Sequence, residues 1–175
     1  PVFKALWEWF EKNAWPIRYK GSTPELLEYL LERGVDHIVA LQYAHKPGIA
    51  RDLNQYMLGL CREFSGRITG LATVFPGEAD APVILEEAFA AGLKGVKLHA
   101  HVQCFDMNSP DMDPIYDICS QKRKPLVMHV GREPKSESYA CDPYVFCRAE
   151  KLERVLRRYP DLSICVPHLG MDEYA

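Results

Sequence analysis

Histidines mark the ends of three short apolar segments of this chain. His99, His129 and His168 each close such a segment, and His101 follows the first of them by two residues. Imidazole is the commonest metal ligand near neutral pH and also carries protons in catalysis. One histidine at a strand end is usually structural, but three in succession form a pattern. If the segments are parallel strands of one sheet, their C-terminal ends share a rim, and the imidazoles converge there.

A regular alternation of segments indicates how those histidines are positioned. Apolar runs rich in β-branched residues occupy 37–43, 68–74, 95–99, 126–130 and 162–166, and helical patterns occupy 50–64, 82–91, 112–123 and 146–159. The runs begin roughly every 30 residues, which is the length of one βα unit. They are apolar throughout rather than alternating, as in parallel strands covered on both faces. The chain is therefore predicted to be an α/β protein with a parallel sheet.

Two layouts fit five parallel strands. An open doubly wound sheet matches 175 residues comfortably, whereas a TIM-type (β/α)8 barrel needs about 250 residues. Length favours the open sheet, and the histidines at successive strand ends favour the barrel. In the barrel interpretation, residues 1–175 are a single, incomplete barrel domain. Its residues 1–34, with an amphipathic helix over 2–15 and a second helix from an N-cap at Thr23 to Gly34, form a helical excursion before the second barrel strand.

The composition argues against several classes of protein. Hydrophobic residues make up 47% and charged residues 26% of the chain, which is typical of a globular domain. The net charge of −3 comes without a basic patch, so nothing indicates a nucleic-acid partner. No apolar stretch approaches the about 20 residues of a membrane-spanning helix, and the first segment lacks a signal-peptide pattern. The six cysteines form no C-x-x-C pair and are predicted to be reduced thiols of a cytoplasmic protein.

Three further features allow a functional and an ordinary interpretation. Arg132, in the loop after His129, could grip a substrate carboxylate through two hydrogen bonds, or it could be a solvated arginine beside Glu133. Cys141 and Cys147 could hold a separate zinc ion, although their separation lacks the usual ligand spacing. The aromatic residues of the first helix indicate a core or a contact in a homo-oligomer: Trp7, Trp9 and Phe10.

Three of the strand segments resemble a known family. Residues 95–99 (GVKLH), 125–131 (PLVMHVG) and 159–170 (YPDLSICVPHLG) are similar to strands four, five and six of the amidohydrolase superfamily. The closest similarity is to its amidohydrolase 2 branch, which includes decarboxylases, lactonases and hydratases of small carboxylated substrates. The resemblance extends from residue 36 to the C-terminus. It implies an incomplete TIM-type barrel in which strands one, seven and eight lie outside this chain.

The resemblance also implies roles for individual residues. His129 corresponds to the strand-five ligand of a divalent metal, zinc by default. His168 corresponds to a histidine that binds a second metal in some members and acts as acid, base or substrate contact in others. The family's His-x-His pair of strand one would lie upstream of Pro1, and its strand-eight aspartate would lie downstream of Ala175. His99 and His101 have the His-x-His spacing, but they follow the strand-four segment, where His99 is a candidate substrate contact.

Lys97 is a candidate catalytic residue with two interpretations. In binuclear members of the family a strand-four lysine becomes a carbamate that bridges two metals, and the segment around Lys97 resembles that strand. The alternative is an unmodified lysine paired with a carboxylate at the mouth of the barrel.

The function implied is that of a metal-dependent hydrolase acting on a small, carboxylated organic substrate through metal-activated water. A non-oxidative decarboxylase and a metal-free lactonase of the same family are the alternatives. A non-catalytic, doubly wound binding domain is the alternative from another class. Its expected Gly-rich turn is absent after the first strand, where residues 43–48 read YAHKPG.

Overall fold

The computed structural model describes residue 8 and residues 10–12, 17–133 and 140–173. These fall into two compact units, 1–38 and 39–175. The predicted helix over 2–15 lies largely outside the described residues. None of the helices in the described ranges has the length and apolar character needed to cross a membrane.

Helix α2 (Thr23–Glu32) lies in the first unit. Its N-cap is Ser22, one residue before the Thr23 predicted from the sequence. Ser22 forms a capping box, because its hydroxyl accepts from the Glu25 N–H and the Glu25 carboxylate accepts from the Ser22 N–H at 2.6 Å. Ser22 is a better N-cap than Thr23, because this arrangement satisfies the backbone N–H groups of Ser22 and Glu25. Pro24 follows within the first turn.

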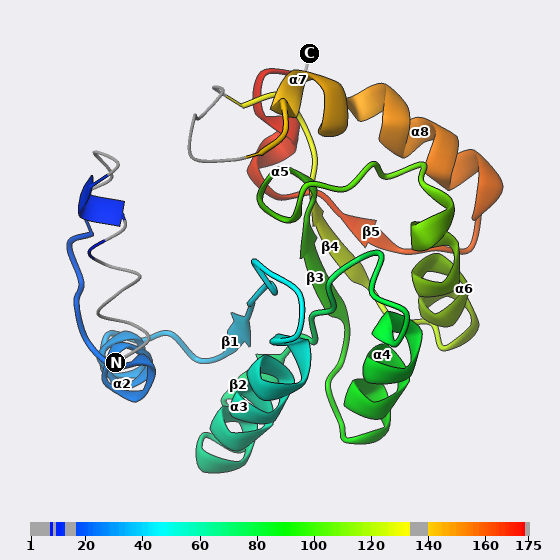
Figure 1. Cartoon of the computed structure of the whole chain (residues 1–175). Helices are drawn as coiled ribbons and strands as arrows, with labels where there is room; N and C mark the ends of the chain where they lie inside the picture. The colour runs from blue at the N-terminus through cyan, green and yellow to red at the C-terminus, as the bar shows by residue number, and fades with distance from the viewer. Residues whose placement is uncertain (1–7, 9, 13–16, 134–139, 174–175) are drawn as a thin grey trace. The chain divides into compact units, whose positions relative to one another are not determined.

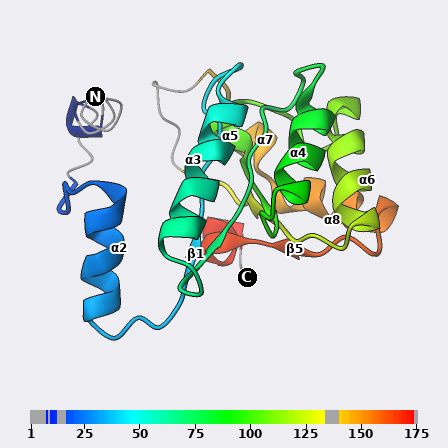
Figure 2. The same cartoon turned by 90° about the horizontal axis from the view of Figure 1, so that it is seen from below.

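The second unit alternates strands and helices as predicted, with shorter strands than the apolar runs suggest. Helix α4 contacts both α3 and α6, and Figures 1 and 2 both show α4 and α6 side by side. The strands are β1 (Ile38–Ala40), β2 (Ile68–Gly70), β3 (Val96–His99), β4 (Leu126–His129) and β5 (Ile164–Cys165). The helices are α3 (Ala50–Glu63), α4 (Ala81–Ala90), α5 (Ala100–Gln103), α6 (Asp113–Gln121), α7 (Pro143–Phe146) and α8 (Ala149–Arg158), with 3-10 turns η1 (Pro110–Met112) and η2 (Pro167–Glu173).

The strand order separates the two predicted layouts. β3, β4 and β5 are parallel and adjacent in that order, and β1 lies beside β2. A parallel bridge from Ala72 to Val96 continues the order from β2 to β3, with Ala72 N–H donating to Gly95 at 2.8 Å. Strands that follow chain order without reversal are typical of a barrel wall, whereas a doubly wound sheet reverses at a switch point. The predicted α/β barrel-type architecture is confirmed, and its described strands do not close into a full barrel.

The two faces of β3 and β4 differ because successive residues of a strand point to opposite sides. One face packs under the helices through four fully buried apolar side chains: Val96, Leu98, Leu126 and Met128. The other face carries Lys97 and His99 from β3 and Val127 and His129 from β4. This second face corresponds to the interior of a barrel, and it positions the candidate site.

Candidate active site

His99 and His129 end adjacent strands and lie opposite each other in the parallel register. Their rings stack with centroids 4.2 Å apart and planes inclined by 11°. The predicted convergence of these two histidines is therefore seen at the C-terminal ends of β3 and β4. In Figure 1 the short helices α5 and α7 lie at this end of the strands, and both belong to the loops that follow them.

A glutamine holds the end of β3 in place. The Gln103 amide nitrogen donates to Ala44 at 2.9 Å and to Val74 at 2.8 Å, and its oxygen accepts from the His99 N–H at 2.8 Å. Gln103 is buried, so these bonds are protected from water. They join the segments after β1 and β2 to the end of β3 and fix the backbone from which the His99 ring projects.

Glu133 completes a group of potential metal ligands. It follows His129 by four residues, and its Oε2 lies 3.5 Å from the buried Nε2 of His129, which makes no hydrogen bond within the described residues. One ligand atom each from His99, His129 and Glu133 lie within 4.8 Å of one another. Two imidazole nitrogens and one carboxylate oxygen form a donor set suited to zinc and similar divalent ions. A buried nitrogen without a partner is also what an ion would satisfy, so these residues fit a metal centre.

The electrostatics keep both rings in the neutral form that binds metal ions. Burial is the main cause that lowers the pKa of His99, to about 2, with further lowering by His129 and Lys97. Burial also lowers the pKa of His129, and the Glu133 carboxylate opposes that shift. A neutral imidazole offers the lone pair that a metal requires.

Lys97 lies on the same face as His99, two residues earlier on β3. Its side chain is buried, and burial lowers its pKa to about 8. Among the residues that the structure describes, no carboxylate forms an ion pair with it. At pH 7 the ammonium form still predominates, so the interior face carries a buried positive charge next to the histidines.

His168 lies at the edge of this group rather than within it. Its ring centroid is 5.6 Å from that of His129, and its side chain is exposed. The backbone from His168 to Gly170 is left-handed, with φ values of 59°, 52° and 78°. His168 is not one of the three residues whose ligand atoms cluster.

Arg132 is engaged with another part of the chain. Its Nε lies 2.6 Å from Oε1 of Glu173, and its guanidinium stands 5.7 Å from the Tyr144 ring centroid. The second oxygen of Glu173 accepts from the Ala149 N–H at 2.6 Å. The arginine thus forms an ion pair with Glu173 in η2, whereas the neighbouring Glu133 contacts the histidines. Its role in binding a substrate carboxylate stays a prediction.

Sequence reasoning missed two members of the site. Glu133 appeared only as a neighbour of Arg132, although its spacing of four from His129 was a usable signal. Tyr43 had no signal at all: it packs edge-on against His99 with centroids 5.2 Å apart. Burial, and to a lesser degree Glu133, raise the Tyr43 pKa. Cys141 and Cys147 are not part of any three-residue ligand group found among the described residues.

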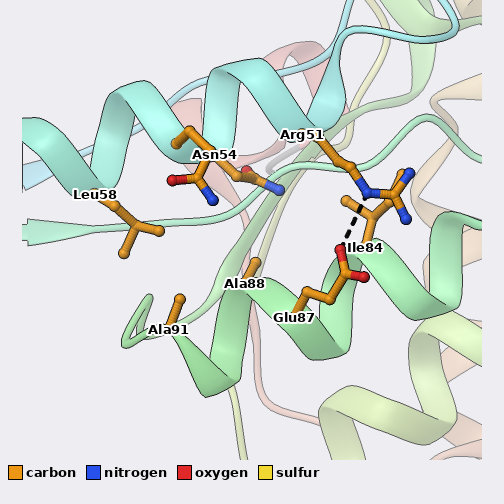
Figure 3. Close-up of a pocket in the computed structure, with 8 residues that line it drawn as sticks. Arg51, Asn54, Leu58, Ile84, Glu87, Ala88 and Ala91 are labelled. Atoms are coloured by element: carbon orange, nitrogen blue, oxygen red, sulfur yellow. Dashed lines mark hydrogen bonds and ion pairs between the residues drawn. The ribbon is translucent and has the colours of Figure 1, made fainter.

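A cleft on the second unit lies away from these residues. It runs between α3 and α4 and contains none of the histidines (Figure 3). Arg51 spans it, with Nε 3.1 Å from Oε2 of Glu87. Arg51 and Glu87, which line this cleft, pair with each other across α3 and α4, so we assign no ligand to it.

Comparisons with known proteins agree with the barrel-type fold. The sequence model of the amidohydrolase family matches residues 6–174. A TIM-barrel protein from Bordetella bronchiseptica superposes with a TM-score of 0.67 at 16% identity, covering 86% of this chain and 52% of that one. A 5-carboxyvanillate decarboxylase from Novosphingobium aromaticivorans, complexed with manganese and 4-hydroxy-3-methoxy-5-nitrobenzoic acid, has a TM-score of 0.63 at 22% identity, with coverages of 86% and 49%. A 2,6-dihydroxybenzoate decarboxylase from Rhizobium has a TM-score of 0.58 at 15% identity, with coverages of 94% and 60%.

No curated protein sequence matches this one. The chain spans about half of the first of these structures, 52% of its length. At such low identities the likeness shows the fold, a TIM-type barrel, while the family model covers nearly the whole chain. The chain therefore belongs to the amidohydrolase family, in the branch that its strand-end histidines resemble.

Proposed function

We propose that this chain forms the metal-binding part of an enzyme that acts on a small, carboxylated organic substrate. One observation carries the proposal: His129 directs a buried, unbonded nitrogen toward Glu133 and stacks on His99, at the C-terminal ends of parallel strands. Active sites of barrel enzymes lie at that end. The family match supports the same reading.

In the proposed reaction, different residues would bind the metal, attract the substrate and transfer protons. His129, Glu133 and His99 would hold a divalent cation, which supplies a Lewis acid that polarises a substrate oxygen or water. The buried Lys97 ammonium would attract a substrate carboxylate to the same face. His168, exposed and beside His129, is free to take up or deliver a proton. Under this proposal, charge attraction by Lys97 and proton transfer by His168 would act around one cation position.

Hydrolysis is the reaction that we propose first, since three protein ligands would leave one position of a divalent ion open to water, and the matching family model is that of the amidohydrolases. Decarboxylation is the second candidate, because the matched structures include two decarboxylases of aromatic acids. A metal-free lactonase is less well supported, since without a metal ion the buried Nε2 of His129 has no hydrogen-bond partner in the described part of the chain. The donor set suits zinc, and the manganese in one matched structure makes manganese the second metal to test.

Metal analysis combined with two activity assays would test the proposal. We expect the purified chain to bind about one Zn²⁺ or Mn²⁺, the number that one cluster of three ligands can hold. Activity is then measured on panels of lactones and amides, for hydrolysis, and of hydroxybenzoates, by release of CO2. Binding of neither metal would contradict the metal centre. Metal binding with CO2 release and no hydrolysis would replace the first reaction by the second.

A further inference from the structure

His99 and His101 have the spacing of a chelating pair, yet they face different partners. His99 ends β3 and stacks on His129. His101 lies one residue into α5, where the chain has turned from strand to helix, and its side chain is only 1% exposed. Its Nδ1 bonds to Oε1 of Glu133. Because the chain turns from strand to helix between them, the His99 and His101 rings contact different residues.

Glu133 connects His101 to the histidine that ends β4. One of its oxygens bonds to His101, and the other lies 3.5 Å from Nε2 of His129. The Glu133 side chain is 14% exposed, so little water competes for either oxygen. A carboxylate on a loop normally samples several rotamers, but one anchored at Oε1 presents Oε2 in a fixed direction.

We propose that His101 is a positioning residue that holds Glu133 for metal binding beside His129. The inference rests on the metal centre proposed above. His101 itself would not touch the ion. It donates from Nδ1 to one oxygen of Glu133, so that the other oxygen stays available as the ligand. The surroundings hold the backbone of His101 in turn, because the thiol of Cys141 bonds to its carbonyl oxygen at 3.2 Å.

The strength of this effect follows from the general behaviour of such partners. Residues that orient a metal ligand typically contribute 10–100-fold to metal affinity. Removing the imidazole in His101→Leu should therefore weaken Zn²⁺ or Mn²⁺ binding by about that factor. His101→Asn places an amide N–H near the position of Nδ1, so it should retain affinity within about 3-fold, because the hydrogen bond is kept.

Calorimetric titration of the chain with Zn²⁺ and with Mn²⁺ would measure these affinities. The set comprises wild type, His101→Leu, His101→Asn, Glu133→Gln and the His101→Leu/Glu133→Gln double variant. If His101 acts through Glu133, the double variant should bind as weakly as Glu133→Gln alone. Tyr116→Phe is the matched control, since it removes a buried hydrogen bond to Met107 away from the site and should leave metal affinity unchanged. Circular dichroism verifies that each variant is folded.

Each outcome decides between the interpretations. Additive losses in the double variant, or unchanged binding in His101→Leu, would overturn the positioning role. Equal weakening by His101→Leu and His101→Asn would also overturn it, because the retained donor should rescue. If wild type binds neither metal, the metal centre proposed above fails, and with it the role of His101 in metal binding. The ¹⁵N shifts of the His101 ring in the metal-free chain test the contact by itself: a change on Glu133→Gln means that His101 and Glu133 are bonded, and no change means that they are not.

Discussion

The imidazole rings of His99 and His129 lie face to face, 4.2 Å apart between centroids, at the ends of two adjacent parallel strands. Two positive rings at this separation would repel by about 4 kcal/mol even in a moderately polar environment. Burial adds to this cost, and both effects lower the pKa of His99. The stack therefore consists of neutral rings whose nitrogens can serve as ligands. The nearby carboxylate of Glu133 adds the negative charge that attracts a cation.

Removal of the His129 imidazole should abolish high-affinity metal binding. The buried Nε2 has no other partner, so His129→Ala takes away one of three ligands. We expect Zn²⁺ affinity to fall by about 100-fold or more, measured by calorimetry. His45→Ala is the control, because His45 is exposed and outside the ligand group. Equal affinities in the two variants would exclude His129 from the metal site.

A methyl group at Gly131 should destabilise the loop that follows β4. Gly131 has a φ of 101°, and an added Cβ would overlap the backbone carbonyl of Gly170. Gly92→Ala provides a matched control, because Gly92 has a φ of 118° and open space around its Cβ position. We expect urea unfolding to show a loss of about 1–2 kcal/mol for Gly92→Ala from backbone strain. Gly131→Ala should lose about 1–3 kcal/mol more from overpacking. Similar losses in both variants would contradict the close approach of the two loops.

Alkylation should separate the cysteines by burial. Cys119 is 1% exposed, and burial raises its pKa to about 12, so it is almost entirely thiol at pH 8. Cys104 and Cys165 are exposed free thiols. We expect iodoacetamide at pH 8 to modify these two in the native chain and Cys119 only after unfolding, because the thiolate is the nucleophile. Mass spectrometry of the alkylated peptides measures this. Labelling of Cys119 at the rate of Cys104 would mean that α6 is not packed as described.

The barrel-type order of elements was predictable because it depends on local patterns. Apolar runs and amphipathic helices repeat at the length of a βα unit, and parallel strands place their C-terminal ends together. The pairing of His99 with His129 followed from that rule, since both residues end their strands. Strand lengths were overestimated: the run at 68–74 contains a strand over Ile68–Gly70 only. Beyond Gly70 the chain pairs with β3 only through an isolated bridge from Ala72 to Val96, which hydropathy does not reveal.

The partners of charged side chains were not predictable. Arg132 and Glu133 are neighbours in sequence, yet they form ion pairs with different elements: Arg132 with Glu173 and Glu133 with His101. These choices depend on how the loop after β4 folds back, and no periodicity encodes that path. The left-handed backbone at His168 is a similar case, because a non-glycine residue adopts it only when tertiary contacts impose it.

His168 should affect turnover without affecting metal content. Its ring lies 5.6 Å from that of His129, between centroids, and it stays outside the group of clustered ligand atoms. Its exposed position leaves the imidazole free to exchange protons with water, as a general acid or base must. In the active enzyme, His168→Asn should lower kcat by roughly 10²–10⁴-fold. The bound metal, measured by elemental analysis, should equal that of wild type.

The neighbouring Leu169 offers a control for this last experiment. Leu169 is 81% exposed and shares the left-handed backbone, so Leu169→Ala tests whether disturbing this segment alone reduces kcat. Normal turnover in Leu169→Ala beside a large loss in His168→Asn would assign the effect to the imidazole. Loss of about half the bound metal in His168→Asn would instead indicate a second ion held by His168, as in binuclear sites. Unchanged turnover with unchanged metal would leave His168 as a structural residue of η2, after β5, because neither proton transfer nor ligation would then depend on it.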